Sequence, residues 1–159
     1  MKKASILATI TLALSLLLMW GFAAADDAPL DAKKLREMLG QLGHTVKDLN
    51  TEVGKEKYSV DFKTESLNIP LGFEISPSKS FVWMTVNLGP APKTGDDMTL
   101  QLLKQNAKVQ PTFFYITDGG SLMAAMAIDN RAISNAVLKA RSEKITADVD
   151  KTRSVWQKS

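Results

Sequence analysis

The chain has 159 residues, of which 20 are basic and 17 acidic, giving a formal net charge of +3, and it contains no cysteine. Without cysteine the protein has no disulfides, thiol nucleophiles or thiolate-bound zinc, so its stability depends on a hydrophobic core alone. Lys2 and Lys3 supply two of the positive charges, and the rest of the chain is nearly balanced, which does not favour nucleic-acid binding.

The first 25 residues have the three parts of a secretory signal peptide. A positive start is followed by an uncharged apolar run of 17 residues, Ile6 to Phe22, and then by small residues that end at Ala25. This pattern predicts cleavage between Ala25 and Asp26 and export of the remainder, to a bacterial periplasm or as a secreted protein. An uncleaved membrane anchor is the alternative, because about 20 apolar residues span a bilayer. Residues 26–159 are expected to form a single domain with its core over about 30–156.

A first helix is predicted over residues 31–42. Asp31 can accept hydrogen bonds from the free N–H groups at the helix start, and Leu30 can pack on Leu35 as a hydrophobic staple. Apolar residues follow at helical spacing, and Gly43 supplies the left-handed residue that ends many helices.

Two strands are predicted next, near residues 58–63 and 71–76, because apolar and polar residues alternate there, and the run FVWMTVNL over 81–88 predicts a third. After a Gly-Pro-Ala-Pro break, a second helix is predicted to start at Asp96 or Asp97 and to end near residue 105.

The last third of the chain predicts two strands, 113–117 and 121–128, joined by a tight turn at Asp118-Gly119-Gly120. A third helix is predicted from a cap at Asp129 or Asn130, and a final helical segment from a cap at Thr146. Short turns between strands imply antiparallel pairing. The expected fold class is therefore α+β, an antiparallel sheet of about five strands with element order α-β-β-β-α-β-β-α.

The last three predicted strands are apolar on both faces, although an α+β sheet is expected to have one polar face. In the strand at 81–88, every second residue is apolar on one face, and Phe81 and Trp83 lie on the other face. The two following strands also carry apolar residues on both faces. One interpretation is that the last helix or a loop covers the second face. The other is a dimer or partner-binding surface built on Phe81, Trp83, Tyr115 and Met123, because aromatic residues and methionine concentrate at interface cores.

No arrangement of residues points to catalysis. His44 is the only histidine, and its position after Gly43 is typical of a contact with a helix end. The acidic pairs Asp96-Asp97 and Asp148-x-Asp150 do not continue into a calcium loop, and they fit helix starts better. We therefore expect a protein that is not an enzyme, with no catalytic residues, metal or cofactor.

The segment LQLLKQNAKV, followed by PTFFYITDGGSLMAAMAI and a closing helix, resembles the type III secretion chaperone-like fold. That grouping includes the Tir-chaperone family and YbjN-type domains, and the resemblance covers about Leu30 to Trp156. It implies a non-enzymatic binding protein, often a homodimer, that holds a segment of its partner against an apolar surface.

Two properties depart from the chaperones of this grouping, which are cytoplasmic and generally acidic. This chain carries a predicted export signal, and it is nearly neutral once the signal is removed. The sequence therefore predicts an exported protein-binding or adaptor domain whose partner is another protein or a second copy, with membrane contact only through an uncleaved N-terminal segment. A periplasmic carrier of a small apolar ligand is the alternative.

Overall fold

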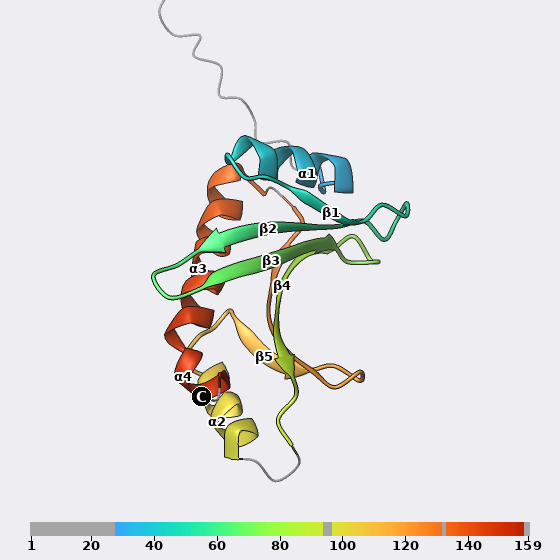
Figure 1. The fold of residues 1–159 in the computed structure, drawn as a ribbon. Coiled ribbons are helices and arrows are strands. Elements are labelled where there is room, and N and C mark those ends of the chain that lie inside the picture. Colours follow the sequence, from blue (N-terminus) through green and yellow to red (C-terminus); the bar gives the residue numbers. More distant parts are fainter. Residues whose placement is uncertain (1–27, 94–96, 132, 158–159) are drawn as a thin grey trace, which may run out of the picture.

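The computed structural model describes residues 28–93, 97–131 and 133–157 (Figure 1). The predicted signal peptide, its cleavage position between Ala25 and Asp26, and Asp96 lie outside the described residues. None of the helices in the described ranges is long and apolar enough to cross a membrane.

Helices and strands follow one another along the chain in the order α-β-β-β-β-α-β-β-α-α. The helices are α1 (Ala32–Gln41), α2 (Asp97–Asn106), α3 (Asn135–Lys151) and α4 (Arg153–Trp156). The strands are β1 (Lys47–Asn50), β2 (Lys57–Lys63), β3 (Asn68–Ile75), β4 (Phe81–Pro90), β5 (Phe113–Ile116) and β6 (Ser121–Asp129).

The six strands form one antiparallel sheet in the order β1-β2-β3-β4-β6-β5. The helices lie on one side of this curved sheet, and the β1–β2 and β5–β6 hairpins project to the other side (Figure 1). The α+β class and the antiparallel sheet are confirmed, and the sheet is one strand larger than expected. The additional strand, β1, was missed because all four of its residues are exposed and three are polar, so it has no apolar alternation.

The core lies between the helices and the helix-facing side of the sheet. Large side chains that are fully buried there come from β2, β3, β4 and β6 and from α1 and α3; they include Leu35, Leu39, Leu71, Phe73, Met84, Leu122, Met126, Leu138 and Ile145. Burying one such side chain contributes about 1.5–3 kcal/mol. The alternation read from the strands therefore identifies the core face correctly.

The start and end of α1 follow the sequence prediction. The Asp31 carboxylate accepts a hydrogen bond from the Lys34 N–H at 2.7 Å, and Leu30 packs against the core. Gly43 follows the helix with φ of 86°, which glycine adopts without the steric cost of a Cβ.

The predicted caps of the last helices are wrong. Ser134, not Asp129 or Asn130, caps α3, and its hydroxyl accepts a hydrogen bond from the Val137 N–H. Thr146 does not begin a new segment, since α3 continues through it to Lys151. Asn130 is instead fully buried, and its side chain holds other parts of the chain together.

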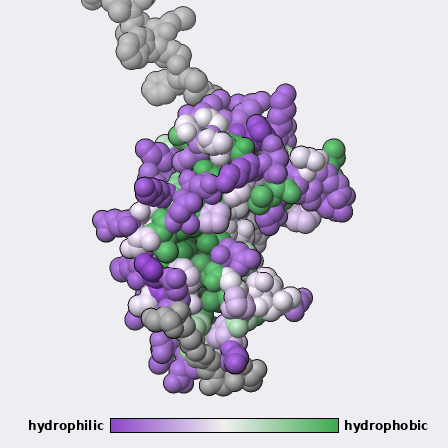
Figure 2. All heavy atoms as spheres, in the orientation of Figure 1, coloured by the Kyte–Doolittle hydropathy of each residue, from purple (hydrophilic) through white to green (hydrophobic). Residues whose placement is uncertain are grey.

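Two neighbouring strands of the sheet, β3 and β4, separate over part of their length. β3 pairs with β4 only between Gly72 and Ile75, whereas β4 pairs with β6 over almost its whole length. The first half of β3 therefore diverges from the second half of β4. Figure 2 shows hydrophobic atoms gathered in the middle of this view, between β3 and β5, and bordered by hydrophilic atoms.

Candidate functional site

The face of the sheet that points away from the core is divided into a charged half and an aromatic half. On the charged half, formed by β1 to β3, Lys47 pairs with Asp61 at 2.6 Å and Lys57 pairs with Glu74 at 3.3 Å. The aromatic half is formed by β4, β5 and β6. We call this whole surface the open face.

Three aromatic side chains, Trp83, Phe113 and Tyr115, form a continuous row on the open face. The Trp83 and Phe113 rings meet edge to face, with centroids 6.1 Å apart and an interplanar angle of 78°. The Phe113 and Tyr115 centroids are 5.9 Å apart. Trp83 and Phe113 are half-buried and Tyr115 is 37% exposed. These centroid distances are those of favourable ring pairs, so each ring holds its neighbour in place.

Small residues allow the rings to meet across the sheet. Phe113 lies opposite Ala125 of β6, and Trp83 lies opposite Ala127, so no large side chain separates the two rings. The cross-strand row that contains Phe113 and Ala125 continues through Thr85 of β4 to Gly72 of β3. A Cβ at Gly72 would lie 2.9 Å from the Thr85 Oγ1, so a larger residue there would force the Thr85 side chain to shift.

The aromatic row forms one wall of a groove of about 710 Å³ on the open face, which we call the open-face groove. The groove is lined by Asn50, Gly54, Lys55, Glu56, Lys57, Glu74, Ile75, Ser76, Pro77, Trp83, Thr85, Phe113 and Tyr115. None of these residues belongs to a described helix, so the last helix does not cover this groove; residues of the β1–β2 and β3–β4 turns line part of it instead. Burial, and to a lesser degree the charge of Glu74, raises the pKa of the Tyr115 hydroxyl.

The structure brings two of the four predicted partner-binding residues together. Trp83 and Tyr115 line the open-face groove. Phe81 and Met123 lie on the same face but not in the groove lining: Phe81 is at the start of β4, and Met123 pairs across strands with Tyr115. Phe113 was not among the four, although its strand pattern placed it on the same side as Tyr115. Its contact with Trp83, 30 positions earlier, leaves no local sequence signal.

His44 lies in a second groove, of about 850 Å³, between the β2–β3 turn and α3. Its ring packs on Phe62, with centroids 4.7 Å apart. Asp61 and Thr64 line the same groove, but Lys47 binds the Asp61 carboxylate and the Leu67 backbone binds the Thr64 hydroxyl. Among the described residues, His44 forms no hydrogen bond with a hydroxyl or a carboxylate, so this groove assembles no nucleophile–base pair.

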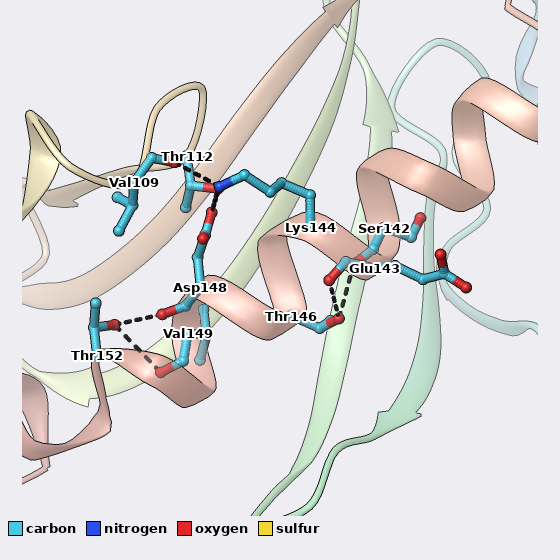
Figure 3. A network of polar contacts seen from close by, with 9 residues as sticks. All are labelled: Val109, Thr112, Ser142, Glu143, Lys144, Thr146, Asp148, Val149 and Thr152. Carbon is cyan, nitrogen blue, oxygen red and sulfur yellow. Dashed lines mark hydrogen bonds and ion pairs between the residues drawn. The ribbon is translucent and has the colours of Figure 1, made fainter.

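Asp148, one of the acidic residues considered for cation binding, is part of a structural network (Figure 3). Its carboxylate accepts hydrogen bonds from the Thr112 hydroxyl, at 2.6 Å, and from the Lys144 ammonium, which also donates to the Val109 carbonyl. The network ties the segment between α2 and β5 to α3. Across the described ranges, no group of three or more histidine or acidic residues is placed to hold a metal ion.

The free edge of β5 is closed by α2. The Asn106 side chain accepts a hydrogen bond from the Phe114 N–H at 2.7 Å and donates one to the Phe114 carbonyl at 3.1 Å. The amide thus occupies the place that a neighbouring strand would take, which protects this edge from pairing with another chain. This contact gives a structural role to Asn106, the asparagine of the LQLLKQN segment.

An apolar hollow between α2 and β5 is small. It has a volume of about 110 Å³ and is lined by residues that include Leu102, Leu103, Phe114 and Leu122. Sites for small organic ligands commonly measure about 300–1,000 Å³. This hollow is therefore too small to hold such a ligand.

No protein-family model matches the sequence, and no curated protein is significantly similar to it. Solved structures are similar in fold. A chain of the HopA1-SchA chaperone-effector complex matches with a TM-score of 0.53 and 12% identity, over 79% of this chain and 99% of that chain. The chain has the type III secretion chaperone-like fold.

A second match is a chain of the heterodimeric complex ExoU-SpcU from the type III secretion system of Pseudomonas aeruginosa. Here the TM-score is 0.48 and the identity 15%, over 77% of this chain and 98% of that chain. The match to the HopA1-SchA complex confirms, at the level of the fold, the resemblance noted in the sequence. In this chaperone-like fold, the open face and its groove are the surface that the described helices leave uncovered.

Proposed function

We propose that this protein is a non-enzymatic binding domain that holds a segment of another protein in the open-face groove. The observation that supports this most strongly is the aromatic row of Trp83, Phe113 and Tyr115, which is half-exposed along a groove of about 710 Å³. Rigid aromatic side chains in a concave surface are the usual anchors of protein interfaces.

The composition of the groove favours a polypeptide as the occupant. Aromatic rings on one side and charged side chains on the other suit a segment that carries both apolar and charged residues. The similar fold of a chain in the HopA1-SchA chaperone-effector complex gives further support, since that chain is bound to another protein. An extended segment needs no free strand edge in this arrangement, because the groove lies on the face of the sheet.

We also propose that the domain works outside the cytoplasm. The support is the N-terminal pattern, a positive start, an apolar run and Ala25 before Asp26. Mass measurement of the protein recovered from the cell envelope tests this: a chain that begins at Asp26 supports cleavage and export. A chain that begins at Met1 in the soluble cytoplasmic fraction contradicts it.

The binding role is tested with charged substitutions on the groove and a matched one outside it. Trp83→Asp and Tyr115→Asp place a carboxylate in the aromatic row, and Val53→Asp adds the same charge at a hairpin position that is 90% exposed and does not line the groove. Partners retained by the purified wild-type protein are identified, produced separately and measured for affinity. Loss of a central aromatic anchor weakens binding by about 30-fold or more.

Both groove variants are expected to weaken the same partner, and Val53→Asp is expected to leave its affinity unchanged. Thermal unfolding of each variant separates loss of binding from loss of fold, and Tyr115→Asp serves if the Trp83 variant does not fold. Native mass spectrometry reports whether the partner is a second copy of the chain. If a purified partner binds wild type and both groove variants equally, the proposed function is wrong.

A further inference from the structure

The open-face groove contains a carboxylate next to its aromatic row. Glu74 of β3 lies opposite Trp83 of β4 in the strand register, so both side chains rise from the same part of the open face. Both line the groove together with Tyr115. The effect of the Glu74 charge on the pKa of the Tyr115 hydroxyl is a further sign of this proximity.

The other charged residues of the groove are engaged within the β1–β2 turn or with Glu74 itself. Lys55 pairs with Glu52 at 2.7 Å, and the Glu56 carboxylate accepts a hydrogen bond from the Gly54 N–H at 2.8 Å. Lys57 is the only groove residue that forms an ion pair with Glu74 among the described residues. Of the two carboxylates that line the groove, Glu56 belongs to the β1–β2 turn, whereas Glu74 lies directly opposite Trp83, so Glu74 is the anionic group beside the aromatic row.

The pair between Lys57 and Glu74 is weak enough to be exchanged. The atoms are 3.3 Å apart and both side chains are more than a third exposed, at 35% and 37%. Exposed pairs of this kind contribute about 0–1 kcal/mol, because water and salt screen them. A cation that gains additional contacts in the groove can therefore replace Lys57 as the partner of Glu74.

Aromatic rings supply such contacts. The face of a tryptophan or tyrosine ring carries negative electrostatic potential and attracts a cation that lies over it. Guanidinium is the best fit, since it is planar, stacks on rings and forms two parallel hydrogen bonds to a carboxylate at the same time.

We propose, on the basis of the binding role above, that the open-face groove recognises a basic side chain of the partner, preferably arginine, held between the aromatic row and Glu74. The partner segment is then one in which an arginine stands beside apolar residues. Lys57 occupies the cation position in the free protein and is displaced when the partner binds.

The experiment starts from a phage library of random 12-residue peptides, selected on the protein that begins at Asp26 and counter-selected on the Trp83→Asp variant. Peptides that depend on Trp83 are synthesised with a fluorescent label, and their affinities are measured by anisotropy. Each arginine is replaced in turn by norleucine or lysine. We expect the norleucine analogue to bind about tenfold or more weakly, and the lysine analogue to lie between the two.

Protein variants test the role of Glu74 directly. Glu74→Gln is expected to weaken the arginine peptide by about five- to tenfold, because the charge is lost and the size is kept. Lys57→Met is expected to tighten binding by up to about fivefold, because it removes the competing cation and retains the stem. Lys55→Met is the matched control, since it changes the net charge equally in the same groove without freeing Glu74.

The outcomes separate this inference from the proposed function. Trp83-dependent peptides without a basic residue, or equal effects of Lys57→Met and Lys55→Met, overturn the arginine site and leave the binding role intact. Recovery of no Trp83-dependent peptide overturns both. Tighter binding by Lys57→Met alone, together with weaker binding by Glu74→Gln, supports the site, since a purely structural role of Lys57 would not produce a gain.

Discussion

Asn130 holds the beginning of the domain in place. The residue is fully buried, and its side-chain N–H groups donate to the Leu30 and Lys79 carbonyls at 3.0 and 2.9 Å. Its side-chain oxygen accepts a hydrogen bond from the Leu30 N–H at 3.1 Å. One amide thus connects the start of α1, the β3–β4 turn and the end of β6.

Asn130→Ala removes all three hydrogen bonds. Each is worth about 1 kcal/mol net, and water can reach part of the site because Leu30 is only partly buried, so we expect a loss of about 2–3 kcal/mol. For a domain of this size that corresponds to a fall in Tm of about 8–12 °C.

Asn130→Asp is expected to cost more than Asn130→Ala at pH 7. The introduced carboxylate faces two carbonyl oxygens and has no proton to donate. Its folded-state pKa is therefore raised, so the variant binds more protons when folded than when unfolded and gains stability as the pH falls towards 4.

Urea unfolding followed by circular dichroism measures these differences. Asn68→Ala, at an exposed position of β3, is the matched control and is expected to change the free energy of unfolding by less than about 0.5 kcal/mol. The reasoning is refuted if Asn130→Ala is as small as this control, or if Asn130→Asp shows no gain in stability on acidification.

Two further predictions concern charged groups. Asp148→Ala leaves the fully buried Thr112 hydroxyl without its acceptor and is expected to lower the free energy of unfolding, measured in urea, by about 2–3 kcal/mol. This value is below that of a fully buried ion pair, because the Lys144 side chain is 39% exposed and water can solvate it. The nearby Asp150→Ala should cost less than about 0.5 kcal/mol, and equal losses in the two variants would contradict the network. Hydrogen bonds from Arg131 lower the pKa of the Asp129 carboxyl from 3.8 to about 2, so this pair stabilises the fold above pH 3.8 and the contribution is lost as the pH falls towards 2. An NMR titration should find that pKa, and Arg131→Ala should return it towards 3.8; a pKa that the variant leaves unchanged would rule out Arg131 as the cause.

Local sequence signals located most elements of the fold. Alternation identified β2 and β3, apolar β-forming runs between turn signals identified β4, β5 and β6, and helical spacing with the Asp31 cap identified α1, because these patterns depend on residues within one turn or one strand. The same reasoning misplaced the start of α3. Asn130 has the composition of a cap, but burial and its bonds to Leu30, 100 positions away, give it a different role.

The candidate site was predictable only in part. The second apolar face of β4 indicated that Trp83 belongs to a surface that needs a partner or a cover. Phe113, Glu74 and the small residues between the strands could not be assigned to the same groove, because the order of β4, β6 and β5 in the sheet brings them together.

The sequence by itself determined the α+β class and the two apolar faces of the central strands, and it predicts export, since each of these inferences depends on local composition or a short period. Tertiary structure alone decided which face remains open, and it placed Trp83, Phe113 and Tyr115 in one row beside Glu74. The physical reason is that β4 and β5, which are far apart in the sequence, both pair with β6 and so lie on either side of it. Ala125 and Ala127 of β6 are small enough for rings from both neighbouring strands to meet above them.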